Sequence, residues 1–146
     1  MTVRLMTIDD YDEIYALWLS CKGMGLNDTD DTREGIERFL KRNPDTNFVA
    51  EEDGRIVGVI MAGNDGRRGY IYHTAVREEC RGRGIATELV KAVLESFKQI
   101  GISKTALVVF GRNEAGNAFW EKMGFTLRTD INYRNLALTE IVRMDT

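Results

Sequence analysis

Cysteine, histidine and proline are scarce in this chain of 146 residues, which has two cysteines, one histidine and one proline. The two cysteines, Cys21 and Cys80, are too few for the disulfide framework of a small secreted protein. They lack the spacing of metal ligands, and His73 stands alone, so we expect no metal site. A reduced, cytoplasmic protein is the expectation that follows.

Long apolar runs and an excess of basic residues are also missing. The apolar stretches are far shorter than the roughly 20 residues of a membrane-spanning helix, and no basic segment leads into an apolar stretch as in a signal peptide. Lys and Arg number 20 against 23 Asp and Glu, which gives a net charge of −3. A general nucleic-acid binder would be basic, so we expect neither a nucleic acid nor a membrane as partner. A local basic patch can still bind an anion.

The rest of the composition is that of an ordinary globular protein, with 43% hydrophobic and 29% charged residues. We expect a single domain over residues 1–146. Apolar periodicity and capping residues predict four helices, between positions 10 and 23, 31 and 43, 86 and 100, and 113 and 124. Alternating and apolar runs predict strands at 3–8, 48–52, 56–62, 70–76, 105–110, 125–130 and 136–144.

This order of elements predicts an α/β fold of the α+β mixed-sheet kind, with six to seven strands flanked by four helices. The three middle strands, joined by turns, should be antiparallel. The crossover from 70–76 to 105–110 should be right-handed and make those two strands parallel. Asp31 followed by Glu34 resembles a capping box for the second helix, and Asn113 can cap the fourth.

The most informative segment joins the 70–76 strand to the third helix and reads Arg81-Gly82-Arg83-Gly84-Ile85-Ala86. Its glycines let the backbone turn tightly, and a helix N-terminus presents unpaired N–H groups and a positive dipole end. Arg81 and Arg83 add charge, and Thr87 adds a hydroxyl. The pattern predicts an anion site suited to a pyrophosphate, with a solvated turn that only caps the helix as the alternative.

Two common phosphate motifs do not fit this segment. The P-loop pattern, Gly then four residues then Gly-Lys-Ser/Thr, is absent. The dinucleotide-binding fingerprint requires a third glycine where Thr87 stands, and an acidic residue that the next strand, near Lys104, does not supply.

Two stretches resemble the GNAT N-acetyltransferase superfamily. Arg81, Gly84 and Ala86 match its central motif, Arg/Gln-x-x-Gly-x-Gly/Ala. The stretch from Asn113-Glu114-Ala115 to Phe119-Trp120-Glu121-Lys122-Met123-Gly124-Phe125 is similar to its Asn-x-x-Ala-x-x-Phe-Tyr-x-x-x-Gly-Phe region. The order of elements also resembles the family over nearly the whole chain, and 39–44 and 65–69 resemble a bacterial subgroup with no assigned acceptor.

The resemblance implies a GNAT-like fold and acetyl-coenzyme A as co-substrate, without a metal. The pyrophosphate would lie on the amides of residues 81–86, and the pantetheine arm would run along the 70–76 strand where it parts from 105–110. The thioester oxygen would lie near the Val76 N–H, a donor of the oxyanion-hole type. The residues implied in coenzyme binding are Thr74, Ala75, Val76, Arg81, Gly82, Arg83, Gly84, Ile85, Ala86, Thr87, Asn113, Asn117, Phe119 and Trp120.

Acetyl transfer to an amine requires a neutral amine, a polarised thioester and a departing thiolate. The family's usual general acid is the Tyr of the Phe-Tyr pair, which is Trp120 here, and an indole N–H cannot act as an acid. Tyr133 is a candidate replacement, and water or no acid at all are the alternatives. Trp120 then reads equally well as an aromatic residue of the core.

Candidates for the base lie on the 70–76 strand. In the family, residues at the positions of Tyr70 and Tyr72 face the acceptor. Strict alternation puts His73, the residue that titrates nearest neutrality, on the other face unless a bulge changes the parity. One of Glu51 and Glu52 could also face the pocket, although a solvated strand end is the plainer reading. The candidate catalytic residues are therefore Tyr72, Tyr70, His73 and Tyr133.

Three further features bear on the reaction. Ribosomal-protein N-terminal acetyltransferases of the superfamily carry a glutamate at the position of Val108, so its absence argues against that activity. Cys80 could carry an acyl group, but the resemblance implies direct transfer in a ternary complex, which is the usual mechanism of the family. Asp28, Asp30 and Asp31 could attract a cationic amine, or they could simply solvate and cap a loop.

Two classes of function fit these features. The first is an acetyl-coenzyme A-dependent N-acetyltransferase that acts on a primary amine of a small molecule, an amino acid or a basic side chain. Its variants include transfer to a protein N-terminus or a lysine. The second is a non-catalytic acyl-coenzyme A-binding sensor module. A homodimer is compatible with both, and no motif identifies the acceptor.

Overall fold

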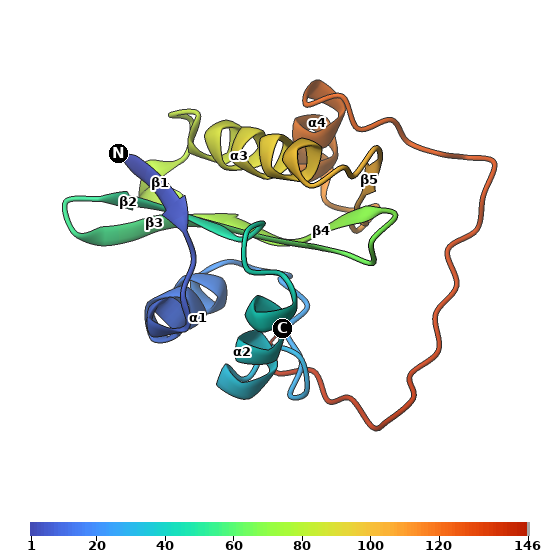
Figure 1. Cartoon of the computed structure of the whole chain (residues 1–146), viewed down its shortest axis with the longest axis horizontal. Helices are drawn as coiled ribbons and strands as arrows, with labels where there is room; N and C mark the ends of the chain where they lie inside the picture. Colours follow the sequence, from blue (N-terminus) through green and yellow to red (C-terminus); the bar gives the residue numbers. More distant parts are fainter. Residues whose placement is uncertain (146) are drawn as a thin grey trace.

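A mixed sheet separates two layers of helices (Figure 1). The computed structural model describes residues 1–145, and within them the sheet has five strands in the order β1-β2-β3-β4-β5. The strands are β1 (Thr2–Leu5), β2 (Phe48–Glu52), β3 (Arg55–Asn64), β4 (Gly69–Val76) and β5 (Thr105–Ala106). Neighbours from β1 to β4 are antiparallel and β5 is parallel to β4, which confirms the predicted strand directions.

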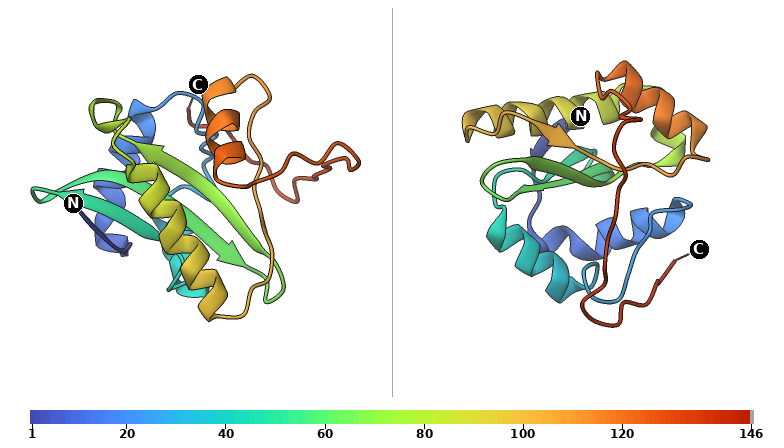
Figure 2. Two further views of the ribbon diagram at one scale, coloured as in Figure 1. Left: turned by 90° about the horizontal axis from the view of Figure 1, so that it is seen from above. Right: turned by 90° about the vertical axis from the view of Figure 1, so that its right-hand side faces the viewer.

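The two faces of the sheet carry two helices each in the described part of the chain (Figures 1 and 2). On one face lie α1 (Tyr11–Ser20) and α2 (Arg33–Arg42), and on the other lie α3 (Ile85–Gln99) and α4 (Glu114–Lys122). Short 3-10 turns, Ile8–Asp10 and Glu78–Cys80, precede α1 and the loop to α3. Across residues 1–145, we find no helix with the length and apolar character that crossing a membrane requires.

Each face of the sheet has its own apolar core, because the side chains of β3 alternate between the faces. Val59 and Met61 pack in a cluster with Trp18 of α1. Ile60 packs in a second cluster with Leu89 of α3. The central strands β3 and β4 are thereby packed from both sides, and β4 is least buried at its middle, from Tyr72 to Thr74.

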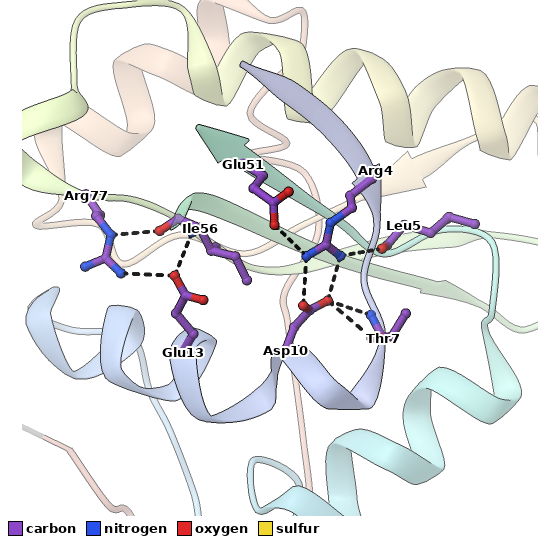
Figure 3. A network of polar contacts seen from close by, with 8 residues as sticks. All are labelled: Arg4, Leu5, Thr7, Asp10, Glu13, Glu51, Ile56 and Arg77. Atoms are coloured by element: carbon purple, nitrogen blue, oxygen red, sulfur yellow. Dashed lines mark hydrogen bonds and ion pairs between the residues drawn. The ribbon is translucent and has the colours of Figure 1, made fainter. Parts of the chain in front are cut away.

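Polar contacts fasten α1 to the sheet (Figure 3). Arg4 of β1 donates two hydrogen bonds of 2.9 Å to the carboxylate of Asp10 and one of 3.1 Å to Glu51 of β2. One turn further along, Glu13 accepts a 2.6 Å hydrogen bond from a main-chain N–H of β3 and lies 3.8 Å from Arg77. Because Arg77 directly follows β4, the loop that leaves this strand starts from a fixed point against α1.

The caps of two helices test the sequence in detail. Asn113 caps α4 as predicted, since its side chain accepts from the N–H of Gly116 at 2.9 Å. The predicted cap of α2 is wrong by one residue. Thr32 accepts from the N–H of Gly35 at 3.1 Å, because the carboxylate of Asp31 is buried and bonded elsewhere.

The chain after α4 departs from the prediction. The expected strands at 125–130 and 136–144 are not formed, apart from one isolated bridge between Asn27 and Arg143, and β5 is shorter than the expected 105–110. The segment runs away from the sheet in an extended path (Figure 1), with Leu136 82% and Leu138 90% exposed. A segment with a strand-like sequence forms a strand only where the edge of a sheet pairs with it. Within the described residues no sheet edge pairs with these two segments, so the sheet has five strands instead of six to seven.

Candidate active site

The loop between β4 and α3 forms an exposed bend of backbone. Gly82 and Gly84 adopt φ angles of 79° and 81°, in the left-handed region that a glycine tolerates without strain. A Cβ at either position would meet nothing within 4 Å, so the space above the bend is open. Gly84 precedes the first turn of α3, and among residues 1–145 no side chain caps that helix. The amide groups at the start of α3 are thus free to receive an anion, with the helix dipole behind them.

The two arginines of this bend are held by neighbours. Arg83 donates a hydrogen bond to the carboxylate of Glu52 at the end of β2, and this bond raises the pKa of the guanidinium. Arg81 donates to the carbonyl of Val76 at 3.2 Å and contacts the sulfur of Cys21 at 3.5 Å. Both cations therefore stand beside the bend in fixed positions.

Beyond its first residues, β4 has no neighbour on the β5 side. The parallel pairs are Gly69 with Thr105 and Tyr70 with Ala106, and no further pair is formed within the described residues. The main chain of β4 up to Val76 therefore lies at an open edge. Thr74 and Ala75 lie on this stretch, next to the bend, where an extended ligand can pair with main-chain groups as an added strand does.

The turn before α4 borders a pocket. Asn117 donates to the carbonyls of Phe110 and Asn113, at 3.0 and 2.8 Å, so it orders the turn before the helix. An open pocket of about 340 Å³ lies between this turn and the end of α1, lined by Lys22, Gly23, Phe110, Arg112 and Asn113. Cys21, next to this pocket in the chain, contacts Arg81 of the bend, and we call the region from the bend to the pocket the cleft.

Trp120 lies in an aromatic cluster. Its ring makes edge contacts with Phe119 at 5.0 Å and with Phe125 at 5.2 Å between centroids. All three pack against the core on the α3 face. This environment agrees with the reading of Trp120 as a packing residue.

A bulge rearranges the face of β4 that carries the candidate catalytic residues. The register with β3 shifts between Ile60, opposite Thr74, and Ala62, opposite Ile71. Two residues of β4, Tyr72 and His73, consequently lie opposite one residue of β3, the residue between Ile60 and Ala62. Tyr72 contacts Phe39 of α2 at 5.5 Å and His73 contacts Trp18 of α1 at 5.0 Å between ring centroids, so both face the α1–α2 layer. The alternation that would turn His73 away from the tyrosines is therefore wrong.

Three tyrosines gather at this place. Tyr70 and Tyr72 lie 4.7 Å apart between ring centroids. Burial, with a smaller contribution from nearby Tyr133, raises the pKa of both phenols. Tyr133 is 67% exposed on the segment after α4. Since a raised pKa keeps a phenol protonated, Tyr70 and Tyr72 are suited to donate a proton or a hydrogen bond, and poorly suited to act as bases.

His73 is held by a partner that the sequence did not reveal. Its Nε2 lies 2.7 Å from Oδ1 of Asp31, and the two side chains are 16% and 5% exposed. The other oxygen of Asp31 accepts from the N–H of Asn27 at 2.9 Å, and the hydroxyl of Tyr11 donates to the Asp31 carbonyl at 2.6 Å. The run of aspartates after α1 was the only signal in the sequence, and it pointed to capping or to charge.

The remaining candidates lie elsewhere. Glu51 is bonded to Arg4, and Glu52 to Arg83, so neither side chain is free to act beside Tyr72. Cys80 is buried in the core under the bend, 7% exposed, which is a poor position for an acyl carrier. Within residues 1–145, no three His, Cys, Asp or Glu side chains are grouped so that they could hold a metal ion.

The sequence matches a known family over most of its length. The model of the acetyltransferase (GNAT) family matches residues 11–125. Acetyltransferase SG1711 of Sodalis glossinidius is 36% identical over 131 residues, 90% of this chain and 91% of that protein. Acetyltransferase plu1384 of Photorhabdus laumondii is 38% identical over 125 residues, 86% of each.

Among solved structures, Ard1 of Thermoplasma volcanium resembles this chain with a TM-score of 0.78. The match covers 87% of this chain and 83% of that one at 22% identity, which shows the shared fold. The family match spans most of the chain, and the two relatives align over most of their lengths. The chain therefore belongs to the acetyltransferase (GNAT) family, whose members are acyltransferases that use acetyl-coenzyme A.

Proposed function

We propose that this chain transfers the acetyl group of acetyl-coenzyme A to a primary amine, by direct transfer in a ternary complex. The acceptor would be a small amine, an amino acid or a basic side chain. The observation that carries the proposal is the uncapped start of α3, which lies directly beside the open edge of β4.

The coenzyme would occupy the bend and the open edge together. Its pyrophosphate would accept hydrogen bonds from the amides of 82–86, near Arg81, Arg83 and the hydroxyl of Thr87. Ile85 is buried beneath the bend and would support it from the core side. The pantetheine arm would pair with the main chain of Thr74, Ala75 and Val76. Asn113, Asn117, Phe119 and Trp120 would shape the opposite wall, and no metal takes part in the scheme.

The chemistry requires removal of a proton from the acceptor, because an ammonium has no lone pair. A primary amine with a lysine-like pKa near 10 costs about 4 kcal/mol to deprotonate at neutral pH. The Val76 N–H would polarise the thioester carbonyl, as an oxyanion-hole donor does. Tyr70, Tyr72 and Tyr133 would supply protons or hold a water near the thiolate, since the first two keep their protons.

The acceptor side of the cleft favours a cation. Asp28 and Asp30 are exposed in the loop after α1, and Asp30 is close enough to raise the pKa of Tyr72 slightly, after burial and Tyr133. Aromatic rings line the same face of β4 and can receive an ammonium through cation–π contacts. The exposed carboxylates of this loop and the aromatic rings of β4 together suit an amine that carries further positive charge.

The second candidate function is binding of acyl-coenzyme A without acetyl transfer. The packing of Trp120 between Phe119 and Phe125 supports a sensor that binds acyl-coenzyme A without turnover, since no acid stands at that position of α4. Calorimetry with coenzyme A, followed by a thiol-release assay with acetyl-coenzyme A, separates the two functions. The amines to screen are amino acids, polyamines, aminoglycosides and basic peptides.

If the chain is an acetyltransferase, we expect thiol release that depends on an amine and increases with pH as the amine loses its proton. Coenzyme binding with no amine raising thiol release above the hydrolysis background would select the sensor. Absence of coenzyme binding would contradict both functions.

A further inference from the structure

His73 occupies a position that the bulge in β4 creates. The bulge turns its ring to the same layer as Tyr72, and the ring is held between an edge contact with Trp18 and the carboxylate of Asp31. Only one ring nitrogen, Nε2, is used in this contact. Across residues 1–145, the other nitrogen, Nδ1, has no hydrogen-bond partner, and the side chain remains 16% exposed.

The partner fixes the tautomer. An ionised carboxylate can only accept hydrogen bonds, so the proton of the neutral ring resides on Nε2 and points at Asp31. Asp31 is itself held by two hydrogen bonds, because its second oxygen accepts from Asn27 and its carbonyl accepts from Tyr11. Nδ1 is therefore left with its lone pair, which is the form of imidazole that can take a proton.

We propose that Nδ1 of His73 is the base that deprotonates the acceptor, and that Asp31 is the positioning residue that holds His73 in the required tautomer. This proposal rests on the acetyl transfer proposed above. His73 lies three strand residues before Val76, about 10 Å along β4, a span that an amine and one bridging water could cover.

The proposed transfer begins with the ammonium form of the acceptor. An N–H bond of the ammonium breaks, and its proton moves to Nδ1 directly or through one water. The amine lone pair then forms the C–N bond at the thioester carbon, and the C–S bond breaks. The thiolate of coenzyme A takes the second amine proton, and the imidazolium returns its proton to solvent. Asp31 lies against the positive charge that the ring carries in between.

The other ionisable groups near the ring come from each element packed around it. They are Asp30 and Asp31 in the α1–α2 loop, Tyr11 on α1, Arg33 on α2, which lies over the Tyr11 ring, and Tyr72 on β4. Burial raises the pKa of Tyr11 and of Tyr72, so both stay protonated near neutrality. Imidazole is the only side chain among these types that ordinarily changes charge between about pH 5 and 8.

Two variants test the proposal with the intact protein. His73→Gln places an amide N–H near the position of Nε2 and so keeps a donor for Asp31, but it has no base at Nδ1. We expect kcat to fall at least about 100-fold while the affinity for coenzyme A is unchanged. The kcat/KM profile should lose its dependence on the imidazole, and only the rise with the alkaline ionisation of the amine should remain.

Asp31→Asn should reverse the tautomer, because the new amide can donate to Nε2 and leave the ring proton on Nδ1. His73 is the only histidine in the chain, so its ring nitrogens give unambiguous ¹⁵N signals once any affinity tag is removed. We expect the wild type to show the Nε2–H form, and Asp31→Asn to show the Nδ1–H form together with reduced kcat. Asp12→Asn, an exposed carboxylate on α1, is the matched control and should change neither.

Several results would overturn the assignment. A His73→Gln enzyme that keeps kcat within about threefold and the wild-type pH profile removes His73 from proton transfer. A wild-type ring protonated on Nδ1 removes Asp31 from its role. A wild type that binds coenzyme A but transfers acetyl to no amine refutes the proposed function and this step with it. An active wild type with an active His73→Gln variant refutes this step alone.

Discussion

Tyr72 shows how much depends on a single hydroxyl. Its ring packs against Phe39 and Tyr70, so the aromatic contacts do not need the oxygen. The phenol holds its proton because burial raises its pKa, and it faces the layer where the acceptor is proposed to bind. The hydroxyl is thus a donor placed at the cleft.

Tyr72→Phe should lower kcat by about tenfold and leave both stability and coenzyme affinity unchanged, because only a proton or hydrogen-bond donor is lost. Steady-state kinetics across pH, with calorimetry for the coenzyme, make the measurement. Tyr15→Phe on α1 removes a hydroxyl outside the cleft and serves as control. Wild-type rates at every pH would exclude Tyr72 from the reaction.

Gly84 offers a test of the proposed pyrophosphate position. Gly84→Glu should weaken coenzyme A binding by more than about tenfold, because a carboxylate would stand where the diphosphate is proposed to lie. Gly101→Glu, at the opposite end of α3, is the matched control. Gly101 also has a positive φ, 86°, and nothing within 4 Å of an added Cβ, so it carries the same backbone strain. Equal affinities of the two variants would contradict the proposed site.

At the scale of elements, most helices and strands could be predicted because their apolar residues follow one period. The bulge in β4 could not, since residues 70–76 alternate well enough in sequence and the extra residue is set by pairing with β3. The orientation of His73 follows from that bulge. Its bond with Asp31 joins positions 42 residues apart, which no local pattern encodes.

The attachment of α1 to the sheet makes an energetic prediction. Burial favours the protonated form of Asp10, but hydrogen bonds from Arg4 and Thr7 outweigh it and lower the pKa of this carboxyl. Arg4→Met should reduce the free energy of unfolding by about 1–2 kcal/mol, because charge-assisted bonds to a largely buried carboxylate are lost. Arg55→Met breaks an exposed pair with Glu79 and should destabilise the fold less than Arg4→Met does, because solvent screens that pair.

The sign of the pH dependence follows from the lowered pKa. The stabilisation by ionised Asp10 is complete above its unfolded pKa, near 4, and is lost as the pH falls through the lower folded value. The stability difference between wild type and Arg4→Met should therefore narrow below about pH 4. Denaturant unfolding from pH 7 to pH 3 measures it, and a constant difference would contradict the role of Arg4.

At the scale of the whole molecule, the mixed sheet and its two helical layers were predictable, and the course of the chain after α4 was not. Residues 125–144 have the alternation of two strands, and apart from the bridge at Arg143 they pair with no strand in the described part of the chain. Their end is nevertheless anchored. Asp145 accepts from the N–H groups of Gly25 and Leu26 at 3.1 and 2.9 Å, and Val142 exchanges hydrogen bonds with Asp28.

This anchor can be released selectively. Asp145→Ala should speed hydrogen exchange at Gly25 and Leu26 by about tenfold, because both amides lose their acceptor. Burial opposes ionisation of Asp145, but bonds from Arg143, Gly25 and Leu26 prevail and lower its pKa. The protection should therefore persist above about pH 4 and decline in more acidic solution. Asp130→Ala, an exposed carboxylate of the same segment, should leave the exchange unchanged.

The loop from Gly25 to Asp31 is held on its outer side by the chain end and on its inner side by the imidazole. An entering molecule too wide to pass without unseating residues 142–145 would disturb the ring as well. The width of an amine, in addition to its charge, would then decide whether the protein acetylates it.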